Sequence, residues 1–504
     1  MTHLQHSIHQ LERKTLFFPL LSFIIPLMVR MIPEILMGPY VTGFDTIGFY
    51  VPNTLNWLQN GVNPSTYLAT APLFYTIFLP IVAVGASPIM VLKILSPLLL
   101  GALGFSIYLY AKNGLRWSTA KSLFIAFLGT LYFVALRASW DQLREELGLI
   151  FLFFALIVLA NSRTGSWKRY TLLSLILVMV VLSHQLVSVI LLGMIVFTIL
   201  NQYIRKDDKS LKLIVASIPA SILFLVIVYL NDITQAGFQN YSTNIVSSLA
   251  SWTGFTSYAS MLMAEGGFLL YCYIPLLPIV LISLKHFENP QLRGWLVLSL
   301  ILLLIPTAFV SPYRWLLILS YPLSFYAVES ISILKSHTWK KVKFPFHRIA
   351  VLYLVLSTCV LSCGFIFMNP QHPFVYFNPE HANGYVYQIP TSMQQNTLSK
   401  IDCQDTEKAF QWFKENTNST AVMLTHTVFY GWALLNLQEN PVIPYGFEEP
   451  DQTATLAIQD GYKEIYVIWW INGKGWYAQP SLSSSFVEVY RTGEIAIYHY
   501  LPIS

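Results

Sequence analysis

The sequence predicts a polytopic α-helical membrane bundle with about 11 crossings, followed by a C-terminal extracytoplasmic α/β domain. Of the 504 residues, 55% are hydrophobic and 11% are charged, whereas soluble domains carry roughly 25% charged residues. Apolar runs of about 20 residues, the length that crosses a bilayer, recur from Thr15 to Met368. From Asn369 to Ser504 the chain turns polar and is long enough for a small core of its own. We therefore divide it into a membrane domain, 1–368, and an outer domain, 369–504.

The lysines and arginines orient the predicted helices. They form six clusters between the apolar runs, and the positive-inside rule places all six in the cytoplasm. The helices then cover residues 15–37, 88–111, 118–137, 146–161, 170–183, 185–203, 211–230, 266–284, 293–310, 313–333 and 349–368. This odd number puts the N-terminus inside and the C-terminal domain outside. Because the basic residues flank membrane segments, the net charge of +5 does not indicate a nucleic-acid partner.

The segment that follows the first helix holds the first candidate for chemistry. Residues 38–70 form a long, aromatic-rich outer loop with one isolated acid, Asp45, in GPYVTGFDTIGFYVPN. The next apolar segment, 71–85, would move a basic cluster outside if it crossed the membrane. We expect it to enter from the outer face and return, and a full crossing there is the alternative.

Cations outside the inner clusters form a second group of candidates. A charge at mid-membrane costs roughly 2.5–3.5 kcal/mol, so embedded charges tend to be paired or functional. Pairing at i,i+4 is the favoured interpretation for Arg30 with Glu34, and it also suits Arg137 with Asp141. Lys93 and Arg314 have no local partner in the sequence. For these two, a site for an anionic headgroup is as good an interpretation as ion pairing.

The segment RASWDQLREE concentrates charge at the outer face. If it is helical, Arg137, Asp141, Arg144 and Glu145 share one side. This side is either an amphipathic turn with internal salt bridges or a wall of the cavity that contains Asp45.

Two further polar positions lie on the same predicted face. His184 stands between two apolar runs, where a packed or capping histidine is the favoured interpretation. Tyr313 and Arg314 begin a helix, and the aromatic residues around them also suit an interfacial belt.

Acids, cations and aromatics at one face of a bundle suit a transferase with a lipid-carried substrate. The lipid tail would lie between helices, and its phosphate would meet Lys93, Arg314 or Arg137, which stabilise the charge on the departing group. A carboxylate opposite would accept the proton of the attacking hydroxyl.

At this point the chain resembles the membrane glycosyltransferases of the C-type fold, such as protein mannosyltransferases and aminoarabinose transferases. GFDTIGFY matches the position of the family's catalytic acid, which implies Asp45 as the general base. GASPIMVLKILSPLL places Lys93 at a basic family position, and SPYRWLLILSYPL places Arg314 where the lipid phosphate binds. RASWDQLREELG puts Asp141 where a second outer acid is expected and looks most like archaeal members.

The resemblance has departures that bear on a metal. Asp45 is single where some branches carry an acidic pair, and VIWWINGKGW lacks the acid of the WWDYG motif of oligosaccharyltransferases. We therefore expect base catalysis without a cofactor. A divalent ion, Mg or Mn, held by Asp45, Asp141 and Glu145 or Glu146 is the alternative.

In the outer domain, hydrophobic patterns predict alternating helices and strands. Asp405 or Thr406 is expected to cap the helix EKAFQWFKEN, and SFVEVYRTGEIAIYHYL reads as a hairpin that turns at Thr492-Gly493. His426 follows a strand, where a polar cap is the favoured interpretation. We expect this domain to cover the cavity or hold the acceptor.

The predicted function is transfer of a sugar, as by a hexosyltransferase, from a polyprenyl (dolichyl) phosphate donor to a protein, lipid or glycan acceptor. The alternatives are a transporter or lipid flippase and a non-catalytic membrane assembly subunit. Transporters generally show internal repeats and charges near the midplane, and the sequence shows neither. Membrane lipids are expected partners in every case.

Overall fold

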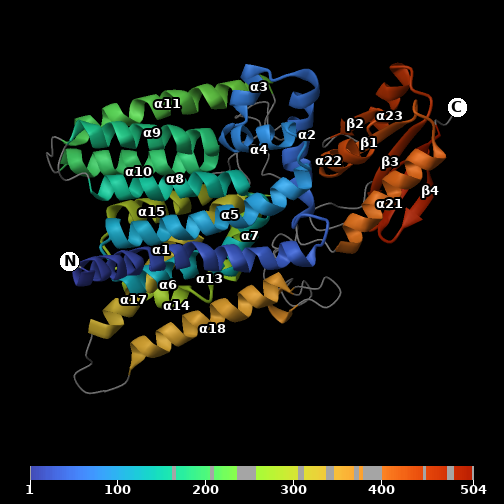
Figure 1. The fold of residues 1–504 in the computed structure, drawn as a ribbon. Coiled ribbons are helices and arrows are strands. Elements are labelled where there is room, and N and C mark those ends of the chain that lie inside the picture. Colours follow the sequence, from blue (N-terminus) through green and yellow to red (C-terminus); the bar gives the residue numbers. More distant parts are fainter. Residues whose placement is uncertain are drawn as a thin grey trace.

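The structure is a computed structural model. It describes residues 2–161, 166–204, 209–234, 257–304, 312–336, 345–367, 374–377, 400–445, 450–473 and 482–501. Long apolar helices form a bundle, and a smaller sheet domain lies against one end of it (Figure 1). The helices of the membrane part are α1 (Thr2–Leu36), α2 (Phe44–Asn60), α3 (Pro64–Ala69), α4 (Leu73–Ala83), α5 (Pro88–Leu109), α6 (Thr119–Leu131), α7 (Phe133–Asp141), α8 (Leu143–Ala160), α9 (Trp167–Ser183), α10 (Gln185–Ile204), α11 (Lys209–Thr234), α13 (Tyr258–Tyr273), α14 (Leu277–Ser283), α15 (Pro290–Leu303), α16 (Pro312–Ile318), α17 (Ser320–Ser336) and α18 (Phe346–Ile366), with the π-helical turn η1 (Tyr110–Gly114) and the 3₁₀ turn η3 (Val375–Phe377).

These helices confirm a multi-pass architecture but not the predicted number of crossings. In the described part of the chain, six helices are long and apolar enough to span a membrane, or eight if two bent pairs each count as one span. The bent pairs are α6 with α7, at 57°, and α13 with α14, at 90°. Three further predicted crossings coincide with α8, α9 and α15. These three do not count as membrane spans. The first turn of α8 carries charged residues, and α9 and α15 have only 17 and 14 residues.

The segment 71–85 contains the short helix α4. Its 11 residues extend about 16 Å at 1.5 Å per residue, roughly half the thickness of the hydrocarbon layer. The helix then ends in a turn at Gly85, whose φ of 96° favours glycine. A helix of this length fits a segment that enters a membrane and returns.

Close helix packing holds α1 against α5. A Cβ atom on Gly104 would lie 2.4 Å from the carbonyl oxygen of Ser22, and one on Gly101 would lie 2.9 Å from that of Phe23. Small residues at these positions let the two backbones approach, as is common between helices in membranes. This contact holds the middle of α1 against α5, and the C-terminal end of α1 leads to α2.

The C-terminal domain is a five-stranded mixed sheet with strand order β2-β1-β3-β5-β4. Its strands are β1 (Val422–His426), β2 (Val442–Tyr445), β3 (Ile465–Trp470), β4 (Phe486–Thr492) and β5 (Ile495–Tyr500), and its helices are α21 (Lys400–Asn416), α22 (Thr427–Asn436) and α23 (Pro450–Gln459). β1 pairs in parallel with β2 and β3, whereas β5 runs antiparallel to β3 and β4. The predicted α/β character and the hairpin are confirmed, but the turn lies one residue later than predicted, at Gly493-Glu494, because Thr492 still pairs with Ile495.

One predicted helix cap in this domain is wrong. α21 begins at Lys400, so Asp405 and Thr406 lie inside the helix and do not cap it. The carboxylate of Asp405 instead accepts hydrogen bonds from Lys408, at 3.0 Å, and from the hydroxyl of Thr492, at 3.1 Å. It therefore ties α21 to the end of β4, a role that no local pattern indicates.

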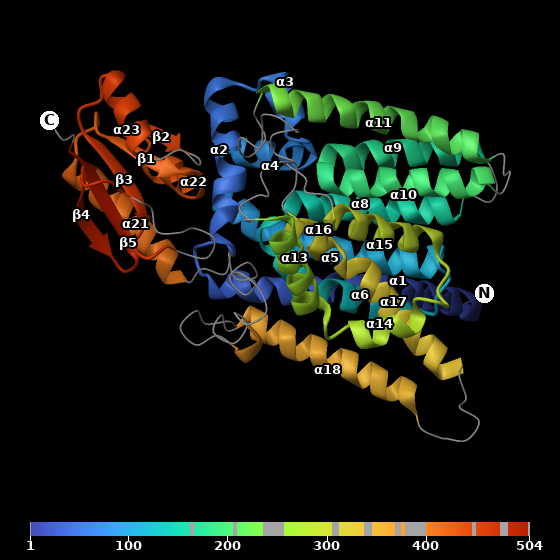
Figure 2. The same cartoon turned by 180° about the vertical axis from the view of Figure 1, so that it is seen from behind.

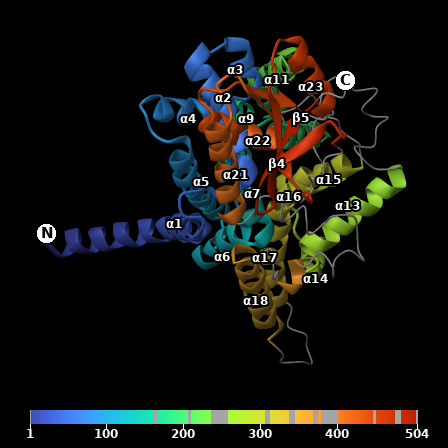
Figure 3. The ribbon, with the colours of Figure 1, turned by 90° about the vertical axis from the view of Figure 1, so that its right-hand side faces the viewer.

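The sheet domain packs on α2 through aromatic side chains. Phe44 stacks on Trp432 with ring centroids 5.1 Å apart, and the indole N–H of Trp432 donates to the carbonyl of Phe44 at 3.2 Å. The hydroxyl of Tyr40 donates to Glu407 at 2.6 Å. Viewed from the opposite side and from the sheet domain, α22 lies beside α2 (Figures 2 and 3).

Candidate functional site

The first turns of α2 lie against the break between α7 and α8. The hydroxyl of Thr46 donates to the carbonyl of Trp140 at 3.0 Å, and that of Tyr50 donates to the carbonyl of Asp141 at 2.9 Å. The Tyr50 oxygen also accepts the amide N–H of Arg144 at 3.4 Å. These bonds place the backbone of Asp45, next to Thr46, beside this break. Its side chain lies outside the described residues.

Arg137 and Asp141 form the ion pair that their i,i+4 spacing predicts. Arg137 Nη1 donates to Asp141 Oδ1 at 2.8 Å, and both side chains are more than 90% buried. Both belong to α7, whose last turn precedes the break. The pair therefore provides buried, mutually neutralised charge immediately beside the start of α2.

Glu145 brings together two candidates from distant parts of the chain. Its Oε1 lies 3.4 Å from Nε2 of His184 and 3.6 Å from Nη1 of Arg314. Glu145 and the neighbouring Glu146 are buried, and their carboxylate oxygens accept no hydrogen bond from the described residues. The start of α8 thus holds two buried acids whose hydrogen-bonding capacity is not used by the part of the chain that the structure describes.

His184 confirms the predicted capping role and also faces this acid. Its Nδ1 accepts the amide N–H of Leu186 at 3.2 Å, at the start of α10. In the neutral imidazole one nitrogen accepts and the other carries the proton. The proton therefore resides on Nε2, the nitrogen that faces Glu145.

The structure gathers most of the predicted site at one end of the bundle. Two groups lie there: Arg137 pairs with Asp141 on α7, and Glu145 of α8 faces Arg314 of α16 and His184, which lies between α9 and α10. Arg144 belongs to the first turn of α8. Tyr313 lies in α16 next to Arg314, and its side chain is outside the described residues.

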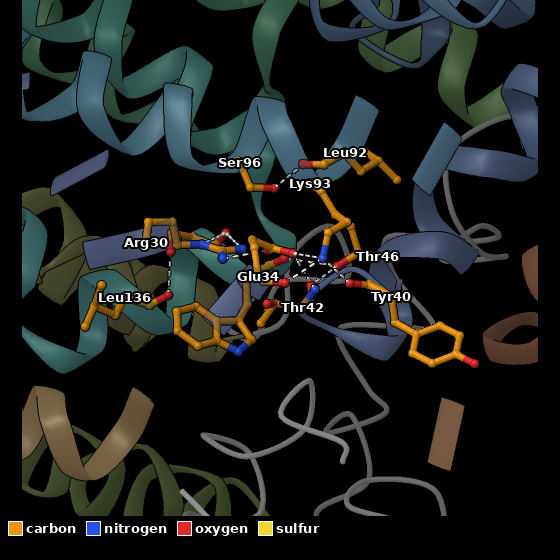
Figure 4. Close-up of polar contacts among 11 residues, drawn as sticks. Arg30, Glu34, Tyr40, Thr42, Thr46, Leu92, Lys93, Ser96 and Leu136 are labelled. Carbon is orange, nitrogen blue, oxygen red and sulfur yellow. Dashed lines mark hydrogen bonds and ion pairs between the residues drawn. The ribbon is translucent and has the colours of Figure 1, made fainter. Parts of the chain in front are cut away.

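Lys93 belongs to a different cluster (Figure 4). Its ammonium group donates to the carbonyl oxygens of Glu34 and Tyr40, both at 2.6 Å, and lies 3.6 Å from the Glu34 carboxylate. The sequence offers Lys93 no local partner, and the fold supplies a distant one. Whether Lys93 also meets a substrate stays a prediction.

The same cluster confirms the predicted pair of Arg30 with Glu34. Their side chains meet at 2.6 Å and are almost fully buried. The guanidinium group also donates to the carbonyl of Ser139, at 3.2 Å from Nη2, and lies over the ring of Trp140. This cluster joins α1, α5 and α7 next to the segment that leads into α2.

Two solved structures are similar to this chain along nearly its whole length. ArnT from Cupriavidus metallidurans, in a structure with bound undecaprenyl phosphate, matches with a TM-score of 0.50 and 11% identity, over 95% of this chain and 97% of that one. The arabinofuranosyltransferase AftD from Mycobacteria matches with a TM-score of 0.51 and 12% identity, over 95% of this chain and 41% of that one. The chain has the fold of the C-type membrane glycosyltransferases.

At this low identity the likeness concerns the C-type fold alone. No family model and no curated protein matches the sequence. The comparisons give no support to the predicted archaeal likeness.

Within the C-type fold, two residues that hold the site together were not predicted from the sequence. Thr46 and Tyr50 bridge α2 to the α7–α8 break, and their partners are backbone carbonyl and amide groups. Every residue carries these groups, so no sequence pattern marks such partners. Thr46 and Tyr50 are polar, but α2 carries several other polar residues, so this character alone does not single them out.

A metal ligand set does not form among the described side chains. No three His, Cys, Asp or Glu residues converge there in a way that could hold an ion. The carboxylate of Asp45 is not among those side chains, so the alternative of a divalent ion held by Asp45, Asp141 and Glu145 or Glu146 stays a prediction.

His426, in the outer domain, is the polar cap that the sequence predicts. Its Nδ1 accepts the amide N–H of Val428 at 3.3 Å, at the start of α22. Burial lowers the pKa of His426 to about 4. A neutral imidazole at ordinary pH retains the acceptor that this cap requires.

Proposed function

We propose that this chain transfers a sugar from a polyprenyl-phosphate donor to an acceptor at the extracytoplasmic face of a membrane. The sugar is a hexose, and the acceptor is a protein, a lipid or a glycan. One observation carries the proposal: Thr46 and Tyr50 hold the turn that contains Asp45 against the α7–α8 break, where buried acids and cations meet. The similarity to ArnT, whose structure contains undecaprenyl phosphate, supports a lipid-phosphate donor.

In this proposal Asp45 is the general base. Its carboxylate takes the proton of the acceptor hydroxyl while the hydroxyl oxygen forms a bond to the anomeric carbon. The bond between that carbon and the phosphate oxygen breaks, and the phosphate leaves with the electron pair. Arg314, Arg137 and Arg144 stabilise the negative charge that develops on the leaving group, and no metal is required.

The proposed orientation follows from the charges and the shape of the bundle. The N-terminal end of α1 lies at the end of the bundle far from the sheet domain (Figures 1 and 2). The six basic clusters favour a cytoplasmic position for that end. The sheet domain and the candidate site then face the extracytoplasmic side.

Replacing the proposed base is the direct test. In membranes that contain the full-length chain, labelled polyprenyl-phosphate mannose, glucose and galactose serve as donors, and labelled product is measured. Asp45→Asn should lower the transfer rate by about 10²–10⁴-fold, because general-base catalysis contributes this much. Asp460→Asn, the same change at an exposed position beyond α23, should leave the rate unchanged.

Two outcomes would overturn the proposal. Full turnover by Asp45→Asn, in a protein that folds normally, would remove Asp45 as the base. Movement of the lipid donor across proteoliposomes without sugar transfer would assign the fold to a transporter or flippase.

A further inference from the structure

A cavity of about 410 Å³ lies at the opposite end of the bundle from the candidate site. It opens between the end of α8, the start of α9 and the turn after η1. Its lining combines two arginines and an amide with apolar side chains: Arg116, Asn161, Arg169, Ile157, Val158 and Leu172. Its volume lies in the range of small-molecule pockets.

An unusual backbone course brings Arg116 to this cavity. α5 ends in the π-helical turn η1, a form that often occurs at functional sites. Gly114 allows the turn to close, because a Cβ atom there would lie 2.7 Å from the ring of Tyr110. Arg116 then has φ of 58°, in the left-handed region that bulky residues rarely adopt. The chain therefore accepts backbone strain where it presents this guanidinium group.

The charge of the cavity suits an anion. Among the described residues no acid lines it, and Arg116 forms no hydrogen bond or ion pair with them. Arg169 donates to the carbonyl of Asn161 at the end of α8. This bond offsets the partial negative charge of that helix end. The helix end therefore does not repel an anion near Arg116.

The apolar side of the cavity suits a lipid. Leu172 lines it and is 48% exposed, and Leu175, less than one turn further along α9, is 60% exposed. Trp167, at the start of α9, is 57% exposed, and Lys212 Nζ lies 5.7 Å from its ring. Exposed tryptophan beside lysine is typical of the membrane–water interface. A headgroup in the cavity would therefore have hydrocarbon surface directly beside it.

We infer that this cavity binds the headgroup of an anionic phospholipid. The lipid belongs to the leaflet at the end of the bundle where the clusters of lysine and arginine lie. The phosphate lies between Arg116 and Arg169, and the acyl chains follow Leu172 and Leu175 along α9. Basic pockets between membrane helices recognise acidic lipid headgroups by this combination of charge and apolar surface. The site is separate from the proposed transfer reaction and does not depend on it.

The test measures lipid binding to the full-length protein in detergent by native mass spectrometry, with phosphatidylglycerol or phosphatidylcholine added. Phosphatidylglycerol should bind more tightly. The double variant Arg116→Gln/Arg169→Gln should weaken its binding by about thirtyfold, since each basic residue near a membrane surface contributes about fivefold. Lys168→Gln removes the same charge one position away, outside the cavity, and should leave binding unchanged.

A second variant tests the shape of the site without changing its charge. Leu172→Trp should fill the cavity and weaken phosphatidylglycerol binding while the thermal midpoint of the protein stays the same. Equal binding of the two lipids, equal loss in Lys168→Gln, or unchanged binding in both cavity variants would overturn the proposal. Displacement of the lipid by inorganic phosphate would instead assign the site to free phosphate.

Discussion

Two charged clusters near the start of α2 differ in how their acids are satisfied. Glu34 receives Arg30 at 2.6 Å and the amide of Thr42 at 3.0 Å, and it faces Lys93 at 3.6 Å. Glu145 lies 3.4 Å from His184 and 3.6 Å from Arg314, and neither of its oxygens accepts a hydrogen bond from the described residues. Buried polar groups are nearly always satisfied in folded proteins. We therefore assign the first cluster to the framework and the second to ligand binding.

The largest expected effect on stability tests the framework cluster. Glu34→Gln should lower the free energy of unfolding by about 3–5 kcal/mol, because it leaves the buried guanidinium group of Arg30 without a counter-charge. Thermal unfolding in detergent measures this. Glu329→Gln breaks an ion pair with Lys121 that is partly exposed and should cost at most about 1 kcal/mol. Equal losses in the two variants would contradict the assignment.

The same change in the second cluster should affect activity instead. Glu145→Gln should lower the transfer rate by about 10–100-fold, which corresponds to an activation free energy higher by about 1.4–2.7 kcal/mol. The thermal midpoint should stay nearly unchanged. Labelled-sugar transfer measures the first effect. Glu146→Gln, one position along the same helix, is the control and should keep its activity. Loss of activity in both variants would favour a shared metal ion over Glu145 alone.

Lys93 and Arg314, whose acidic neighbours come from other helices, allow a third comparison. Arg314→Met should raise the concentration of lipid donor needed for half-maximal rate by about tenfold, or about 1.4 kcal/mol, because Arg314 is proposed to meet the phosphate. Lys93→Met should leave that concentration unchanged and lower the thermal midpoint. The dependence of the transfer rate on donor concentration distinguishes these results, and the reverse pattern would exchange the two roles.

The smallest effect concerns the link between α2 and the second cluster. Tyr50→Phe removes a hydroxyl that bonds two backbone groups of the α7–α8 break. It should cost about 1 kcal/mol of stability and reduce the maximal rate more than donor binding, because the position of Asp45 becomes less fixed. Tyr67→Phe, in α3, is the control. A change only in donor binding would contradict a role in positioning α2.

The sequence predicts the helices well where hydrophobicity alone decides them. The predicted 185–203 and 211–230 match α10 and α11 within a few residues. Prediction from the sequence fails where tertiary contacts decide where a helix ends. The predicted helix 118–137 breaks at Tyr132, whose hydroxyl donates to the carbonyl of Cys272, and no proline marks that break. In the site, pairs at i,i+4 are predictable, whereas the approach of Arg314 to Glu145 depends on how distant helices pack.

The crossing of α22 over α2 has a consequence for how large acceptors reach the membrane. A Cβ atom on Gly431 would lie 2.5 Å from the carbonyl oxygen of Ile47, so the two backbones leave no room to slide past one another. Tilting the sheet domain away would separate these backbones and break the hydrogen bond from Trp432 to the carbonyl of Phe44, directly before Asp45. If the chain acts as proposed, we therefore expect a bulky acceptor to approach along a route that leaves this contact closed.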